Sequence, residues 1–163
     1  MAFIFSNFSE SPCTRPVTLS PAGIRKDNYN IDELNKFKDS DDIMKSFLII
    51  GMGHFGHHLC RSLAETDCEI MIVDKNEEAI EDMLPYVVSA KIGDCTNIEV
   101  LKTFDIPSFD TCFVCIGENF QNSLEITSLL KDECGAKKVI SKADRDIQEK
   151  FLLKNGADEV IYP

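Results

Sequence analysis

The stretch FLIIGMGHFGHHLCRSLAE, Phe47 to Glu65, contains an apolar run, three glycines and an amphipathic helical pattern in direct succession. Gly51, Gly53 and Gly56 match the spacing G-x-G-x-x-G between a buried strand and a helix. The first glycine permits a tight turn, the second lets backbone amides approach a diphosphate, and the third allows close helix–strand packing. Free amides and the helix dipole then attract an anion. We therefore expect a phosphate-binding loop here; the alternative is that the glycines serve only turning and packing.

Outward from this stretch, short apolar runs alternate with helical patterns. Such runs are typical of parallel strands that are buried on both faces. Six strands alternating with helices predict an α/β, Rossmann-like, doubly wound and mostly parallel six-stranded sheet. The predicted strands are 46–50, 68–73, 87–93, 111–116, 137–141 and 159–162.

The helices have recognisable start and stop signals. Asn76 is placed to cap a helix, with glutamates in the first turn. Thr96 and Glu99 have the spacing of a capping box. Gly135 and Gly156 each follow a helical pattern, which predicts a helix end there.

Charge and composition divide the chain at about residue 45. Residues 1–45 carry 6 Lys/Arg against 7 Asp/Glu, whereas residues 46–163 carry 11 against 21. We expect a poorly ordered N-terminal arm over 1–45 and one nucleotide-binding domain over 46–163. A formal net charge of −11 argues against nucleic acid as a partner, because nucleic acid needs a basic surface.

The sequence contains no apolar run near the roughly 20 residues of a membrane-spanning helix. Its seven cysteines are an odd number and are scattered through predicted core segments. Scattered thiols of this kind are typical of a reducing compartment, so we expect a cytoplasmic location.

A carboxylate stands where a nucleotide ribose would lie. Asp74 closes the second predicted strand, 23 residues after Gly51, and an acid there hydrogen-bonds the ribose hydroxyls of the adenosine. It also repels a 2′-phosphate, which favours NAD(H), ATP or ADP over NADP. Asp94 and Cys95 follow the third strand and would flank the adenine edge. The alternative for this pair is a polar turn that serves only the following helix cap.

The three histidines lie at positions 54, 57 and 58 of the helix after the glycines. Phe55 and Leu59 belong to the buried stripe of that helix, while His57 is expected on its solvated face. A metal site from His54 and His58 is not favoured, because no carboxylate or cysteine joins them nearby. Cys112 and Cys115 have C-x-x-C spacing but lie inside a strand, where residues three apart point to opposite faces. Core packing is therefore expected for both thiols.

Taken together, FLIIGMGHFG, IVDKNEE, GDCTN, TCFVCIGENFQNSL and KNGADEVIYP resemble a known family. The resemblance covers residues 46–163 and is to the N-terminal nucleotide-binding domain (TrkA-N/KTN) of RCK/Trk-type potassium-transport regulatory subunits. It implies that the phosphates contact Gly51, Gly53, His54, Phe55 and Gly56. It further implies that the adenosine ribose contacts Asp74 and Lys75, and that the adenine contacts Asp94 and Cys95. The distal half of the ligand would contact Gly117, Glu118 and Asn119.

The resemblance implies a cytosolic, non-catalytic subunit that binds NAD(H) or ATP/ADP. It would form homo-oligomers, as dimers or rings, and gate a membrane potassium channel or transporter while peripherally associated with the membrane. His54 is a departure, because ATP-responsive regulators often have an arginine there, and the shorter histidine predicts weaker discrimination between ATP and ADP. Family members also commonly continue past the sixth strand, so we expect a fragment or a reduced subunit.

Two rival functions stay open. One is a small NAD-dependent oxidoreductase or a dehydrogenase fragment, which needs a proton-transfer group near the cofactor. The segment 117–125, GENFQNSLE, offers carboxylates and amides but no evident acid–base partner. The other is a nucleotide sensor with a soluble partner.

Overall fold

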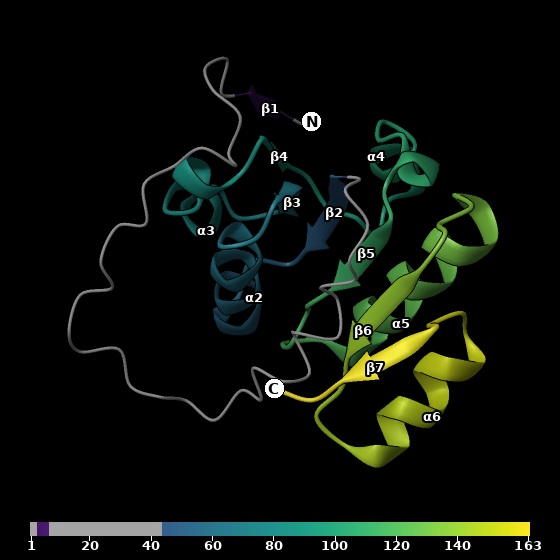
Figure 1. The fold of residues 1–163 in the computed structure, drawn as a ribbon. Helices are drawn as coiled ribbons and strands as arrows, with labels where there is room; N and C mark the ends of the chain where they lie inside the picture. Colours follow the sequence, from purple (N-terminus) through teal and green to yellow (C-terminus); the bar gives the residue numbers. More distant parts are fainter. Residues whose placement is uncertain (1–2, 7–43) are drawn as a thin grey trace.

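A computed structural model describes residues 3–6 and 44–163, and for 3–6 it describes the backbone alone. Its seven-stranded sheet has the order β1-β4-β3-β2-β5-β6-β7 (Figure 1). The strands are β1 Phe3–Ser6, β2 Lys45–Ile50, β3 Cys68–Asp74, β4 Ser89–Ile92, β5 Thr111–Val114, β6 Val139–Lys142 and β7 Glu159–Ile161.

The six strands β2 to β7 are the predicted ones, and they pair with one another in parallel. Their order is that of a Rossmann domain, so the predicted fold class is confirmed. The strand β1 was not predicted: it lies antiparallel to β4 at the sheet edge. This strand was not expected within the predicted arm over 1–45, of which residues 1–2 and 7–43 lie outside the described residues.

The helices cover both faces of the sheet (Figure 1). Residues of α2 and α3 belong to one core cluster, and residues of α4, α5 and η4 belong to the cluster on the opposite face. Within β2, Phe47 and Ile49 lie in the first cluster while Leu48 and Ile50 lie in the second. The helical segments are α2 His54–Ala64, α3 Glu77–Glu81, η2 Leu84–Tyr86, α4 Ile98–Leu101, η3 Ile106–Ser108, α5 Phe120–Ser128, η4 Leu129–Glu133 (a π-helix) and α6 Asp146–Lys154.

The two faces explain the cysteine pair. Cys112 belongs to one cluster and Cys115 to the other, so their thiols lie on opposite sides of the sheet. The predicted packing role of this C-x-x-C spacing is confirmed. Burial raises the pKa of the Cys112 thiol to about 12, and the nearby Cys134 adds to the rise. Both effects keep Cys112 in its neutral form.

The helix ends follow the predicted signals with one correction. Asn76 caps α3 by accepting from the Glu78 amide at 3.1 Å, and Gly135 and Gly156 have φ values of +68° and +110° after η4 and α6. The capping box was wrong in its first residue. Asn97 rather than Thr96 caps α4, and it accepts from the Glu99 amide at 3.0 Å.

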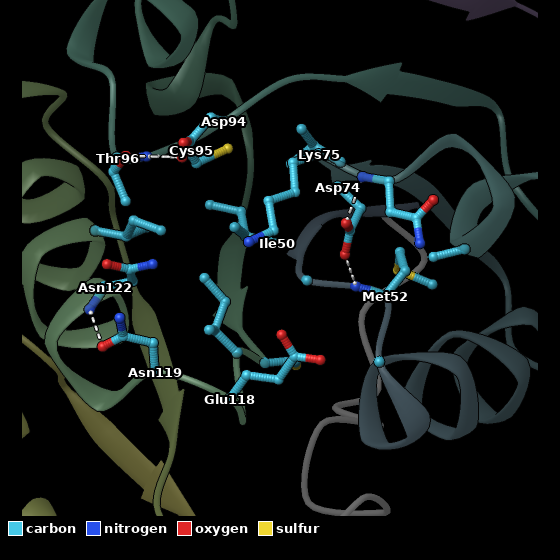
Figure 2. Close-up of a pocket in the computed structure, with 18 of the residues that line it drawn as sticks. Ile50, Met52, Asp74, Lys75, Asp94, Cys95, Thr96, Glu118, Asn119 and Asn122 are labelled. Atoms are coloured by element: carbon cyan, nitrogen blue, oxygen red, sulfur yellow. Dashed lines mark hydrogen bonds between the residues drawn. The ribbon is translucent and has the colours of Figure 1, made fainter.

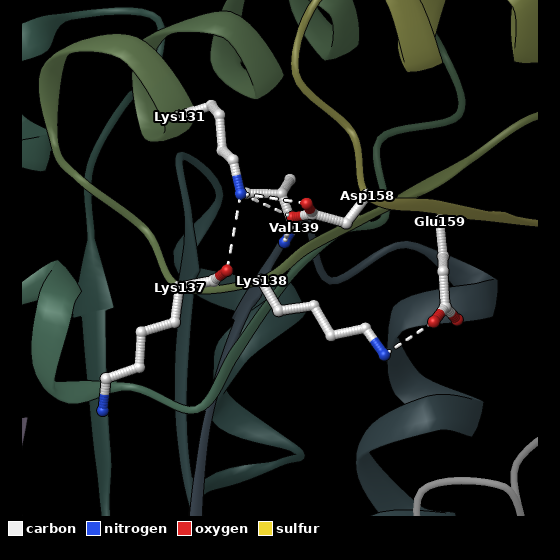
Figure 3. Close-up of polar contacts among 6 residues, drawn as sticks. All are labelled: Lys131, Lys137, Lys138, Val139, Asp158 and Glu159. Carbon is white, nitrogen blue, oxygen red and sulfur yellow. Dashed lines mark hydrogen bonds and ion pairs between the residues drawn. The ribbon is translucent and has the colours of Figure 1, made fainter.

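A carboxylate joins η4, β6 and β7 at the amino ends of the last two strands (Figure 3). The Asp158 Oδ2 accepts from the Val139 amide at 2.8 Å and pairs with the Lys131 ammonium at 2.9 Å. Lys131 also donates to the Lys137 carbonyl at 3.4 Å. This cluster therefore ties the π-helix to the sheet.

We expect Asp158→Ala to lower the free energy of unfolding by about 1–2 kcal/mol, because the Val139 amide and the Lys131 ammonium both lose their acceptor. Partial exposure of the pair keeps the loss at this level. Glu159→Ala is the control, since Glu159 makes only a half-exposed ion pair with Lys138 at 2.7 Å; its effect is expected within about 0.5 kcal/mol. Urea denaturation measures both, and equal losses would contradict a special role for Asp158.

Candidate functional site

A pocket of about 270 Å³ opens at the carboxyl ends of β2, β3, β4 and β5 (Figure 2). The strand β3 lies on one side of β2 and β5 lies on the other side, so the direction in which successive strands are added to the sheet reverses at β2. The pocket lies at this point. Ligands of open α/β sheets bind at this place. The pocket is therefore the candidate site.

The glycine loop forms the wall beside α2. Gly51 has a φ of +94°, which side chains rarely tolerate, and its amide donates to the Val73 carbonyl at 2.9 Å. A Cβ at Gly56 would lie 2.1 Å from the Gly51 carbonyl oxygen, so only glycine lets α2 approach the loop this closely. A Cβ at Gly53 would meet nothing within 4 Å. The loop is thus tight on the strand side and open at Gly53.

The amino end of α2 adjoins this pocket at Gly53. Gly53 is the N-cap, and within the described part of the chain no side chain caps the helix and no acid lies in its first turn. The first amides of a helix have no intrahelical acceptor, and the dipole gives this end a partial positive charge. Because Gly53 also lines the pocket, an anion bound there would meet these amides.

Asp74 lies beside the glycine loop and holds the loop in place. Its Oδ2 accepts from the Met52 amide at 2.7 Å, and its Oδ1 accepts from the Asn76 amide at 2.8 Å (Figure 2). A carboxylate oxygen has two lone pairs, so each still has acceptor capacity for a ligand hydroxyl. The same side chain therefore shapes the glycine loop and is available to a ribose.

The turn after β4 supplies an acid and a thiol. Hydrogen bonds from Thr96, by its hydroxyl at 2.7 Å and its amide at 3.0 Å, hold the pKa of Asp94 below its ordinary value. The nearby Lys75 acts in the same direction. Burial, followed by the charge of Asp94, raises the pKa of Cys95 to about 12. The turn thus presents a charged carboxylate next to a neutral, apolar thiol.

The remaining wall follows β5. Gly117, Glu118 and Asn119 line the pocket and are exposed. Asn119 caps α5, and its Oδ1 accepts from the Gln121 amide at 2.9 Å. It also accepts from the Asn122 amide at 3.4 Å (Figure 2). Its NH₂ group remains a potential donor to a ligand.

The structure brings most of the predicted site residues together. Those that line the pocket are Gly51, Gly53, Asp74, Lys75, Asp94, Cys95, Gly117, Glu118 and Asn119. His54, Phe55 and Gly56 are not among the lining residues. Phe55 is buried in the core, Gly56 packs against Gly51, and His54 is exposed with its ring 4.7 Å from that of His58.

The solvated position expected for His57 is corrected. Its Nε2 lies 2.7 Å from the Ala79 carbonyl oxygen, so the ring joins α2 to α3. Over residues 3–6 and 44–163, no group of three or more His, Cys, Asp and Glu side chains is placed to hold a metal ion.

Sequence reasoning missed several residues of the pocket wall, among them Met52, Asn76, Thr96, Ile116 and Asn122. Met52 contributes a backbone amide, which leaves no signal in the sequence. Asn76 and Thr96 were recognised only as helix caps. Asn122 lies just inside α5 after its cap, and its place beside Asn119 was the available signal.

Solved structures share this fold. The TrkA-N domain of inner membrane protein ybaL from Escherichia coli matches with a TM-score of 0.65 and 20% identity, over 75% of this chain and 90% of that one. A structure of the GsuK channel bound to NAD matches with a TM-score of 0.63 and 16% identity, over 75% of this chain and 22% of that one. At these identities the likeness establishes the fold. Within the described ranges, no helix has the length and apolar character needed to span a membrane.

Two curated relatives are closer in sequence. Ktr system potassium uptake protein C of Bacillus subtilis (strain 168) is 39% identical over 119 residues, which are 73% of this chain and 53% of the relative. Ktr system potassium uptake protein A of Vibrio alginolyticus is 31% identical over 119 residues, 73% of this chain and 54% of the relative. The chain spans about half the length of these relatives. The family model described as the TrkA-N domain matches residues 47–163, and the chain belongs to the TrkA-N family.

Proposed function

We propose that this chain binds an adenine nucleotide, NAD(H) or ATP/ADP, and thereby regulates a membrane potassium channel or transporter. The observation that carries the proposal is the pairing of two features in one pocket. The amino end of α2, which no described side chain caps, and the Asp74 carboxylate both adjoin the glycine loop, which Asp74 contacts through the Met52 amide. They suit the diphosphate and the ribose of one ligand.

The ligand lies along the carboxyl ends of the strands in this proposal. The diphosphate meets the amides around Gly53, and the ribose hydroxyls meet Asp74 and Lys75. The adenine lies against the turn of Asp94 and Cys95, and the distal half extends toward Gly117, Glu118 and Asn119. His54, Phe55 and Gly56 contribute through backbone amides or packing. A 2′-phosphate would face the Asp74 carboxylate, so NADP is disfavoured.

The proposed regulation of potassium transport is supported by membership of the TrkA-N family and by the relatives in potassium uptake systems. The curated relatives are potassium uptake proteins of the Ktr system, and GsuK structures are described as bound to NAD and to ADP. We propose a homo-oligomeric subunit on the cytoplasmic side that contacts the membrane through the transporter. The nucleotide regulates only if it binds one assembly geometry more tightly than another.

The chemistry of the pocket supports binding without catalysis. Of the described residues that line it, none is histidine, serine or tyrosine. Asp74 and Asp94 already accept hydrogen bonds from the backbone, and the raised pKa of Cys95 makes its thiol a poor nucleophile. An NAD-dependent oxidoreductase has no supporting observation of equal weight.

Thermal unfolding with NADH, NAD, ATP, ADP and NADP tests the proposal. At 100 times its Kd a ligand adds about 2.7 kcal/mol to stability, so we expect a clear rise in Tm with at least one of the first four and little with NADP. GTP is the base control. A flat response to all five, or a rise with NADP equal to that with NAD, would contradict the proposal. Steady cofactor turnover with alcohols or hydroxy acids would favour the enzyme instead.

A further inference from the structure

A lysine ammonium lies directly behind the distal wall of the pocket. Lys142 ends β6, and a Cβ built at Gly117 would lie 3.0 Å from its Nζ. Gly117 lines the pocket, whereas Lys142 does not. The missing side chain at Gly117 therefore leaves room for the ammonium next to the pocket.

This ammonium forms an ion pair with one carboxylate, and the two side chains differ in their exposure to solvent. The Lys142 Nζ lies 2.9 Å from the Asp144 Oδ1, with 11% of the lysine side chain and 48% of the aspartate side chain exposed. Lys142 also lies close enough to Cys115 to oppose the rise in thiol pKa that burial causes. The positive charge thus faces inward, toward residues that line the pocket, and the acid faces outward.

The pocket itself is poor in positive charge. Asp74, Asp94 and Glu118 line it, while Lys75 is the single cation among its described lining residues. The amino end of α2 serves a phosphate near Gly53, but Gly117 lies on the wall that follows β5. A phosphate that extends to this wall would meet Glu118 and needs a nearby cation.

We propose that Lys142 and Asp144 together set the affinity of the site for the distal phosphate of an adenine nucleotide. Lys142 receives the phosphate, and Asp144 competes with it for the ammonium in the free protein. This inference rests on the proposed function and narrows its ligand to a nucleoside diphosphate or triphosphate with a free terminal phosphate. Asp144 therefore lowers that affinity.

Calorimetric titration of the full chain with AMP, ADP and ATP tests this pair. AMP is the reference, because it has no distal phosphate. Lys142→Gln is expected to lower ATP and ADP affinity about tenfold relative to AMP. Asp144→Asn is expected to raise both about two- to fivefold relative to AMP. In the double variant Lys142→Gln/Asp144→Asn, the rise in ATP and ADP affinity caused by Asp144→Asn should vanish, because no ammonium remains for Asp144 to release.

Lys138→Gln and Glu159→Gln are the matched controls, since this ion pair lies at the amino end of β6. Neither should change the ratio of ATP to AMP affinity. If the unmodified chain binds no adenine nucleotide, the proposed function itself fails. The inference alone is overturned if the chain binds an adenine nucleotide but Asp144→Asn leaves the ratio of ATP to AMP affinity unchanged. It is also overturned if Asp144→Asn changes this ratio equally in the Lys142→Gln background. Asp144→Asn suffices for this test should Lys142→Gln not fold.

Discussion

Replacing Gly56 with alanine is expected to lower the free energy of unfolding by about 3 kcal/mol or more. The new Cβ would lie 2.1 Å from the Gly51 carbonyl oxygen and 3.1 Å from its carbonyl carbon. Both atoms belong to the backbone of a turn that is held by the hydrogen bond from the Gly51 amide to the Val73 carbonyl at 2.9 Å. Displacing either atom therefore costs free energy. Either α2 shifts away from the sheet or the loop opens. Urea denaturation followed by circular dichroism measures the loss.

Gly53→Ala is the matched control within the same motif. Its Cβ would meet nothing within 4 Å, and its φ of −71° suits any residue. Stability is therefore expected within about 0.5 kcal/mol of the original chain. Nucleotide affinity should fall nevertheless, because the methyl group takes space where a diphosphate approaches the helix amides. A stable Gly56→Ala variant, or an unstable Gly53→Ala variant, would contradict this division of roles.

The sequence predicted the six parallel strands because their apolar runs are buried on both faces and leave a strong pattern. Phe3–Ser6 (FIFS) is also apolar, but it stands apart from the alternation of strands and helices, and it forms an edge strand through its pairing with the distant β4. The cap of α4 failed for a similar reason. Thr96 and Asn97 are adjacent candidates for the cap. The Thr96 hydroxyl donates a hydrogen bond to Asp94, so Asn97 caps the helix instead.

The site was predictable wherever local spacing determines it. The glycines and Asp74 follow from the strand–turn–helix pattern and the end of the next strand. The bond from the Met52 amide to Asp74 could not be predicted, because a backbone donor has no sequence signature. Lys142 was missed because 25 residues separate it from Gly117, and only the pairing of β5 with β6 brings them together.

Asp74→Ala is expected to reduce adenine nucleotide affinity by about 100-fold or more, the largest binding effect of any single change in the pocket. Two losses combine. The ribose hydroxyls lose a charged acceptor, which is worth about 1.5–3 kcal/mol for each hydrogen bond. The amides of Met52 and Asn76 lose the carboxylate that they bond at 2.7 and 2.8 Å, so the glycine loop loses its anchor. Isothermal titration calorimetry measures the affinity.

The two losses separate in Asp74→Asn, which keeps one amide oxygen as an acceptor but removes the negative charge. If Asp74 acts mainly on the ribose, Asp74→Asn retains most of the unliganded Tm and raises the affinity for NADP relative to NAD, because the repulsion of a 2′-phosphate disappears. If Asp74 serves only to hold the loop, both variants lower the Tm and the NADP to NAD ratio stays constant. Affinity close to that of the original chain in Asp74→Ala would exclude both roles and, with them, a nucleotide bound through this carboxylate.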